Sequence, residues 1–209
     1  SGTFVPFVPP GDNGKGGYLL RAAYEDKGTK ELSSLASEDI ITLRNSVVDP
    51  ESADKTKGVL MMTTPRRSFN MVGPDGYLGF SSLDLTGIKQ IEFLVQATPR
   101  SGAAGGNIEI HIDSPDGPLI GQTDQVVPKE VDFRAFAAAN NPPAAKKGGT
   151  TQAQPTPMDP AARRRMMSTS VNAGLKSMEG LHDLYFVFKN SQAAPNQITM
   201  QVMEIQFHN

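Results

Sequence analysis

The chain has 209 residues, of which 38% are hydrophobic and 20% charged, and its formal net charge is −2. This balance supports a packed core and shows no basic excess of the kind that nucleic-acid binding requires. The sequence contains no cysteine, which excludes disulfides, thiolate catalysis and cysteine-ligated zinc, and no apolar run approaches the roughly 18 residues of a membrane-spanning helix.

The first 17 residues combine three Pro in the first ten positions with a Gly-rich stretch. Because this composition disfavours a strand inside a sheet, we interpret residues 1–17 as an arm or linker, with Phe4 and Phe7 able to pin it to the body. The chain begins with Ser and shows no signal peptide. We therefore expect a mature form or an excised domain.

Short strands are predicted after this arm. Residues 18–24 (YLLRAAY) form a plausible first strand, and residues 39–48 (DIITLRNSVV) are enriched in β-branched side chains. Between them, residues 31–38 predict a short helix, which two serines weaken. Residues 58–63 (GVLMMT) predict another short apolar strand.

The middle of the chain alternates strands with strong turn signals. Residues 69–72 and 77–80 flank the sequence Gly-Pro-Asp-Gly at 73–76, which predicts a turn between two strands. In residues 88–97, alternate positions are apolar, so Ile91, Phe93 and Val95 are expected on one buried face.

The clearest pattern lies between residues 105 and 121, GGNIEIHIDSPDGPLIG. Ile108, Ile110 and Ile112 alternate with polar residues, which is typical of a strand with one buried face. Four turn formers follow at 114–117, and a second apolar run ends at Gly121. We predict a β-hairpin here.

Residues 132–171 interrupt this rhythm with Pro, Gly, Ala, Gln and Thr, and residues 137–157 contain no large aliphatic side chain. Such a segment cannot bury enough apolar surface to offset its ordering entropy, so we expect an excursion from the fold. Within it, residues 161–167 predict a short helix. The three arginines at 163–165 suit a solvated face or, alternatively, an anion site.

Two strands are predicted to close the chain. In residues 181–190 both faces carry apolar side chains, so this strand is expected to be central, and residues 198–207 form the last strand. About ten short strands at spacings near 10 residues favour an all-β antiparallel sandwich or jelly roll over a parallel α/β sheet. We expect one such domain over residues 18–209.

Three segments carry a resemblance to a known family: residues 77–91 (YLGFSSLDLTGIKQI), 105–121 and 181–190. Together they resemble family 6 carbohydrate-binding modules, of the type appended to large exported bacterial proteins. The likeness covers most of residues 18–207 outside the excursion. It implies a galactose-binding-like jelly roll that binds a polysaccharide or oligosaccharide without catalysis, outside the cytoplasm.

In that family, loops at one edge of the sandwich form a cleft with two aromatic rings and an Asn, since rings cover the C–H face of a sugar and amides bind its hydroxyls. This sequence departs from the plan because it has no Trp. Ordinary core or turn positions are the alternative for each candidate. The ligand-binding residues that the resemblance implies are Tyr24, Phe69, Tyr77, Phe133, Phe136, Asn190 and Asn196.

The resemblance also implies a structural calcium, which takes hard oxygen ligands. The family's Glu position in the first strand corresponds to Ala23, and its Asp position in the last strand corresponds to Met203. Glu25 lies nearby, and Glu204 is one residue away, which points to the opposite face of a strand. We therefore expect this calcium site to be lost or rebuilt, and we assign no metal ligand.

No catalytic motif is recognisable. None of the three histidines has metal-ligand spacing, and Glu109 with His111 could act as a proton-transfer pair or simply form a polar strand face. We expect no enzyme. The main alternative to a glycan-binding module is a structural or protein-interaction sandwich that has lost the sugar cleft, with other domains of a parent protein as partners.

Overall fold

The computed structural model describes residues 17–30, 32–64, 67–131 and 159–209, and its chain divides into two compact units, Ser1–Val48 and Asp49–Asn209. No helix in these described ranges is long and apolar enough to span a membrane. The elements of the first unit are β1 (Gly17–Glu25), β2 (Ala36–Arg44) and β3 (Val47–Val48). Those of the second are η1 (Pro50–Ser52), β4 (Lys55–Thr64), β5 (Arg67–Asp84), β6 (Gln90–Gln96), η2 (Pro99–Ser101), β7 (Asn107–Ile112), β8 (Leu119–Gln122), α2 (Pro160–Met167), β9 (Thr169–Gly174), β10 (Leu181–Lys189) and β11 (Met200–His208).

The first unit contains an antiparallel hairpin in which β1 and β2 pair over nine consecutive positions, from Gly17–Arg44 to Glu25–Ala36. Arg21 Nη2 donates to Glu38 Oε2 at 2.6 Å across the two strands. In the turn, Asp26 Oδ1 accepts from the backbone N–H groups of Gly28 and Leu35, and these bonds, that from Leu35 first, lower the pKa of Asp26. The predicted strand at 18–24 is confirmed. The predicted helix at 31–38 is wrong, because Ala36–Glu38 already pair with β1.

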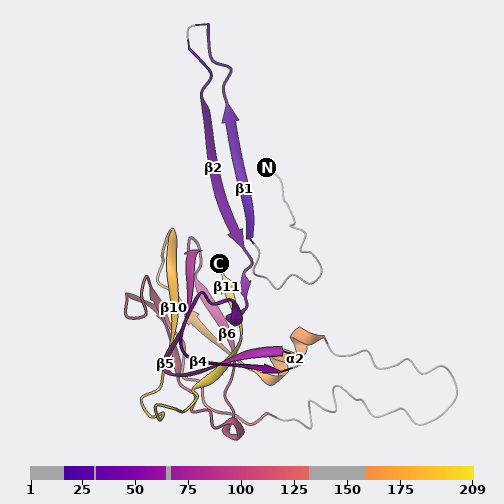
Figure 1. The fold of residues 1–209 in the computed structure, drawn as a ribbon, viewed down its shortest axis with the longest axis vertical. Coiled ribbons are helices and arrows are strands. Elements are labelled where there is room, and N and C mark those ends of the chain that lie inside the picture. Colours follow the sequence, from indigo (N-terminus) through magenta and orange to yellow (C-terminus); the bar gives the residue numbers. More distant parts are fainter. Residues whose placement is uncertain (1–16, 31, 65–66, 132–158) are drawn as a thin grey trace, which may run out of the picture. The chain divides into compact units, whose positions relative to one another are not determined.

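The second unit is an antiparallel sheet whose main path runs β8–β7–β10–β5–β11–β6–β9, with β4 added to β5 (Figure 1). The two ends of this path meet, because Gly121 forms a bridge with Leu175 and Lys176 N donates to Ile120 O at 2.8 Å. The sheet therefore folds on itself into two layers. The expected all-β sandwich is confirmed, as are the hairpin of β7 and β8 and the central position of β10 between β5 and β7.

β5 belongs to both layers. Residues 70–72 pair with β11, whereas residues 77–84 pair with β10. The predicted turn at 73–76 is wrong in form, because the segment is a bend inside one long strand and not a hairpin turn. Gly76 is required at this bend: a Cβ there would meet Lys57 O and Val72 Cγ1 at 2.8 Å.

The core lies between the layers. Phe93 of β6 and Phe186 of β10 meet edge to face with ring centroids 5.0 Å apart, so the two layers interlock through aromatic side chains. The alternating isoleucines predicted in β7 are all buried, as are the predicted inward residues of β6. Completely buried side chains include Val72, Leu78, Ile91, Ile108, Ile110, Leu184, Phe188 and Ile205.

Candidate binding site

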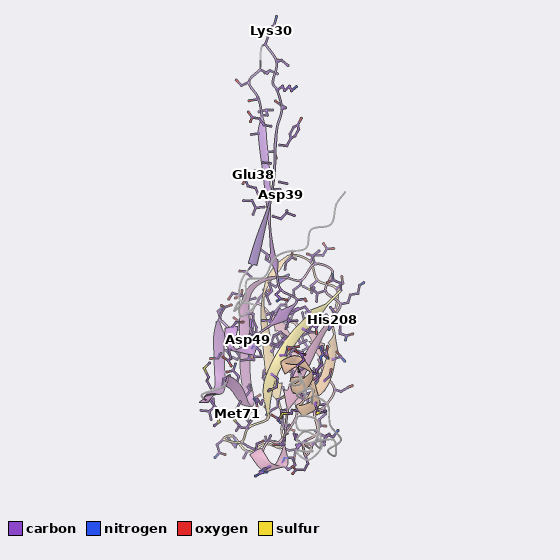
Figure 2. All side chains as sticks on the ribbon, turned by 90° about the vertical axis from the view of Figure 1, so that its right-hand side faces the viewer. Lys30, Glu38, Asp39, Asp49, Met71 and His208 are labelled. Atoms are coloured by element: carbon purple, nitrogen blue, oxygen red, sulfur yellow. The ribbon has the colours of Figure 1, made fainter. Side chains whose placement is uncertain are left out.

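A row of side chains crosses the outer surface of the layer formed by β5, β11 and β6. Gln201 of β11 lies opposite Met71 on one side and opposite Gln96 of β6 on the other. Alternation along β11 explains this position, since Met200 and Val202 on either side of Gln201 are buried in the core. Two amides and a thioether therefore stand side by side, half-buried, at one end of β11. Figure 2 labels Met71 at this end and His208 at the other.

This row forms the floor of a groove made of two adjoining hollows, with volumes of about 210 and 260 Å³. Both hollows share Gln96, Thr98 and Glu130. The first is lined further by Met71, Arg100, Ser101, Ala103, Ile198 and Gln201, and the second by Ala97, Lys129, Val131, Met166, Met167, Ser168 and Thr169.

Backbone and capping hydrogen bonds fix the walls of the groove. Thr98 caps η2 by accepting from Ser101 N at 3.3 Å through its hydroxyl, and Gly102 closes the turn with a φ of 71°. Lys129 N donates to Ala97 O at 2.9 Å, which ties the segment after β8 to the end of β6. The groove is therefore a preformed feature of the framework.

α2 forms the far wall. Asp159 caps it by accepting from Ala162 N at 3.1 Å, and Pro160 occupies its first turn, as helix starts favour. The helix predicted at 161–167 is confirmed. Arg165 Nη1 reaches Glu92 Oε1 on β6 at 3.4 Å, and Ser170 Oγ donates to the same oxygen at 2.6 Å. The bond from Ser170, followed by the charge of Arg165, lowers the pKa of Glu92.

Three polar side chains at the groove have no hydrogen-bond partner among the described residues. No hydrogen bond joins the side chain of Gln96, Gln201 or Glu130 to any residue in the part of the chain that the structure describes. Amide and carboxylate groups that are half-exposed in a concave surface can bind hydroxyls of a ligand without first breaking an internal bond. Met71 and Ile198 add apolar surface beside them.

The outer surface of the other layer is also polar. A row crosses four strands through Lys55 of β4, Gly79 of β5, Tyr185 of β10 and His111 of β7. Gly79 makes room for the neighbouring ring, because a Cβ there would lie 3.0 Å from Tyr185 Cε1. Tyr77, one row away, meets Tyr185 edge to face at 5.5 Å.

The polar groups of this second surface bond to one another. Lys55 Nζ donates to Asp183 Oδ2 at 2.8 Å and to Tyr185 Oη at 3.0 Å. Asp183 and Tyr185 thus raise the pKa of Lys55, and Lys55, followed by the Ser82 N–H, lowers the pKa of Asp183. His111 lies between Gly117 O at 2.7 Å and Glu109 Oε2 at 3.1 Å, so its ring braces the β7–β8 hairpin.

Four of the residues predicted as ligand contacts have described side chains, one in the first unit and three in the second. Tyr24 is 70% exposed on β1 in the first unit, whereas Tyr77 lies on the polar surface of the second. Asn190 Nδ2 donates to Ala104 O and Gly105 O, both at 3.1 Å, and its Oδ1 accepts from Gln192 N, which is a loop-fixing role. Asn196 is exposed in the loop before β11.

Three predicted rings cannot be placed: Phe133 and Phe136 lie outside the described residues, as does the side chain of Phe69. Val131, which lines the groove, precedes Phe133 by two positions. The ligand roles of all seven residues stay predictions. Sequence reasoning missed Gln96 and Gln201, and the available signal was their outward position between buried neighbours in two predicted strands.

No group of three or more His, Asp or Glu side chains within the described ranges has a geometry suited to a metal ion. Ala23 and Glu25 lie on β1, and Met203 and Glu204 lie on β11, where the register shifts between Val202 and Glu204. The loss or rebuilding of the calcium site stays a prediction.

Solved structures of family 6 carbohydrate-binding modules are similar to this chain. One from Clostridium cellulolyticum, in complex with xylose, has a TM-score of 0.53 and 18% identity over 78% of this chain and 96% of its own. A β-1,3-glucan-binding module from Bacillus halodurans has a TM-score of 0.52 and 19% identity over 78% and 95%.

A Bacillus subtilis arabinoxylan arabinofuranohydrolase of glycoside hydrolase family 43, in complex with cellotetraose, matches with a TM-score of 0.52 and 14% identity. This match covers 87% of the present chain but 32% of the enzyme chain. No protein-family model and no curated protein matches the sequence. At these identities the likeness establishes the fold, which is the jelly roll that the sequence resemblance implied.

Proposed function

We propose that the second unit is a non-catalytic carbohydrate-binding module and that the groove beside β6 and β11 holds the glycan. The observation that carries this proposal is the pair of amides on the groove floor. Gln96 and Gln201 lie side by side in a preformed groove and have no hydrogen-bond partner among the described residues. The hollows, at about 210 and 260 Å³, suit a short stretch of sugar units.

Chemistry supports a neutral glycan. The amide side chains offer both donors and acceptors, which match sugar hydroxyls, and Glu130 accepts from a hydroxyl pair. Met71 and Ile198 provide the apolar surface on which C–H groups of the ring can rest. The similarity in fold to modules that bind xylose and β-1,3-glucan supports the same class of ligand. We propose further that such a module belongs to an exported parent protein and therefore acts outside the cytoplasm.

Isothermal titration calorimetry with xylo-, cello- and β-1,3-gluco-oligosaccharides tests this proposal. Replacing Gln96 and Gln201 by Ala removes two ligand hydrogen bonds and is expected to weaken binding by about five- to 150-fold, since each such bond contributes roughly 0.5–1.5 kcal/mol. Gln122→Ala, an exposed amide on β8, is the matched control and keeps full affinity. Absence of binding across all three series would reject the proposal.

One observation favours a second function. None of the described residues that line the groove is aromatic, whereas sugar clefts usually contain stacking rings. Met71, Met166 and Met167 instead give the groove an adaptable thioether lining, which is common on protein-binding surfaces. A structural or protein-interaction domain is therefore the alternative, and affinity for another domain of the parent protein with no glycan affinity would support it.

A further inference from the structure

The row of side chains on the groove floor continues beyond β5 onto β4. Leu60 of β4 lies directly opposite Met71 of β5. Met71 lies opposite Gln201 of β11, and Gln201 lies opposite Gln96 of β6. Residues that lie opposite each other in antiparallel strands point to the same face of the sheet, with Cβ atoms about 4.5–5.5 Å apart. One unbroken row therefore crosses four strands on the outer surface of this layer.

The outer face of β4 is apolar where the row reaches it. Leu60 is 57% exposed, and Met62, two positions along the strand and therefore on the same face, is 43% exposed. We call Leu60 and Met62 the ledge. Together with the neighbouring Met71 they make a contiguous apolar patch on the surface. Contiguous patches of this kind mark ligand grooves and other interaction surfaces, whereas leucines exposed singly need no explanation.

The position of the ledge indicates what binds to it. The ledge adjoins the hollow that Met71 and Gln201 line, and no member of the row is charged. Neighbouring strands lie about 4.8 Å apart, so the row extends about 14 Å from Leu60 to Gln96, which is longer than one sugar ring. A ligand that lies along the row therefore meets two amides at one end and aliphatic and thioether groups at the other.

We propose that the ledge is a further sugar subsite, which binds the C–H face of a ring in the same glycan whose hydroxyls bond to Gln96 and Gln201. This inference rests on the proposed function of the groove. A sugar ring carries hydroxyls around its rim and C–H groups over its face, so a glycan needs both polar and apolar surface. The ledge supplies apolar contact that aromatic rings supply in other sugar clefts.

The subsite makes affinity depend on the length of the glycan. A short oligosaccharide held by the two amides leaves the ledge empty, whereas a longer one gains apolar contact there. Loss of contact with one or two methylene groups corresponds to about a four- to fifteenfold loss of affinity. Leu60→Ala should cause this loss for long ligands alone. The double replacement of Gln96 and Gln201 by Ala should weaken short and long ligands alike.

Isothermal titration calorimetry on the whole chain tests the subsite, with xylo-, cello- and β-1,3-gluco-oligosaccharides from the disaccharide to the hexasaccharide. Wild-type affinity is expected to rise with length and to level off once the row is filled. Leu60→Ala should remove about four- to fifteenfold of this rise and leave the disaccharide unaffected. Leu20→Ala is the matched control, because Leu20 of β1 is also 57% exposed, and it should bind like the wild type.

The lack of tryptophan allows a second test, which does not depend on a loss of affinity. Leu60→Trp introduces a single tryptophan at the ledge, and a sugar that stacks on its ring shields the ring from water. Its fluorescence emission should therefore shift to shorter wavelength with the hexasaccharide and not with the disaccharide. Leu20→Trp should show no shift with either ligand.

Failure of the subsite can be distinguished from failure of the groove. Absence of binding heat in all three series rejects the groove as a glycan site, and the ledge with it. If binding depends on Gln96 and Gln201 but is equally strong in the wild type and in Leu60→Ala at every length, the groove stands and the subsite is overturned. An unshifted fluorescence spectrum in Leu60→Trp at saturating hexasaccharide also overturns the subsite. A ledge that serves a protein partner instead would give these last two results.

Discussion

Both outer surfaces of the sandwich carry polar residues, but the hydrogen bonding of these residues differs. On the surface of β4, β5, β10 and β7, Lys55 donates to both Asp183 and Tyr185, and Glu109 bonds to His111. On the surface of β11 and β6, the amides of Gln96 and Gln201 have no partner among the described residues. Polar composition alone therefore does not identify a binding surface; the state of its hydrogen bonds does.

The difference has a physical cause. A network whose donors and acceptors are already paired contributes to folding, and a ligand would have to replace those bonds at little net gain. Unpaired amides at a concave edge gain bonds when a ligand arrives. Substitutions on the first surface should therefore lower stability and spare binding, whereas substitutions in the groove should do the reverse.

The largest effect is expected from Tyr185→Ala. Tyr185 is 5% exposed and packs on Gly79 and Tyr77, so losing its ring should lower the free energy of unfolding by about 3–4 kcal/mol. Urea denaturation measures this loss. Tyr185→Phe keeps the ring and should cost far less. Glycan affinity of the folded fraction should not change, and a large loss of affinity would mean that this surface also binds.

An effect of intermediate size on stability is expected from Asn190→Ala. This variant distinguishes a role of Asn190 in fixing its loop from a role in contacting the ligand. The side chain holds two carbonyls, Ala104 O and Gly105 O, so its removal should lower the free energy of unfolding by about 1–2 kcal/mol. Calorimetric affinity for oligosaccharides should fall by much less than in the Gln96 and Gln201 double variant. If affinity is abolished while stability holds, Asn190 is a ligand residue as the family resemblance implied.

The smallest effect is expected from Glu92→Gln, which keeps the shape of the side chain but removes its charge beside Arg165 and His208. The pKa of Glu92 is lowered in the folded protein, so its charge contributes stability above the unfolded pKa of about 4.3, and this contribution is lost as the pH falls through the lower folded pKa.

The wild type should therefore exceed Glu92→Gln in stability by about 0.5–1 kcal/mol at neutral pH, and the two should converge as the pH falls through the lowered folded pKa of Glu92. Thermal unfolding across this pH range measures the difference. A gap that persists at acid pH where Glu92 is protonated in both the folded and the unfolded state would show that shape, and not charge, is what Glu92 contributes. Because Arg165 belongs to α2, the variant should also slightly weaken binding in the groove.

Local patterns predicted much of the sandwich. The isoleucines of β7 and the two-sided apolar run of β10 needed only alternation along one strand, and both lie where they were expected. The bend in β5 was not predictable in this way, because Gly73–Gly76 carries the same residues as a hairpin turn and only the change of partner from β11 to β10 keeps the strand continuous. The helix expected at 31–38 failed for a similar reason, since pairing with β1 overrides local propensity.

The groove was harder to predict from the sequence than the sandwich. Gln96 and Gln201 are more than a hundred residues apart and meet only because β6 pairs with β11 in one register. α2 and the segment around Glu130 then complete the walls. The family resemblance predicted aromatic ligand contacts, whereas the described residues of the groove include the amides of Gln96 and Gln201.

Because β5 runs through both layers, it links the unfolding of one layer to the unfolding of the other. Residues 70–72 of β5 pair with β11, and residues 77–84 pair with β10. Unfolding the layer of β11 and β6 therefore disturbs the strand that also holds the other layer. Slow amide exchange in Val72 and Leu78 should consequently be governed by a single global event, and force applied to either end of the second unit should meet one rupture barrier.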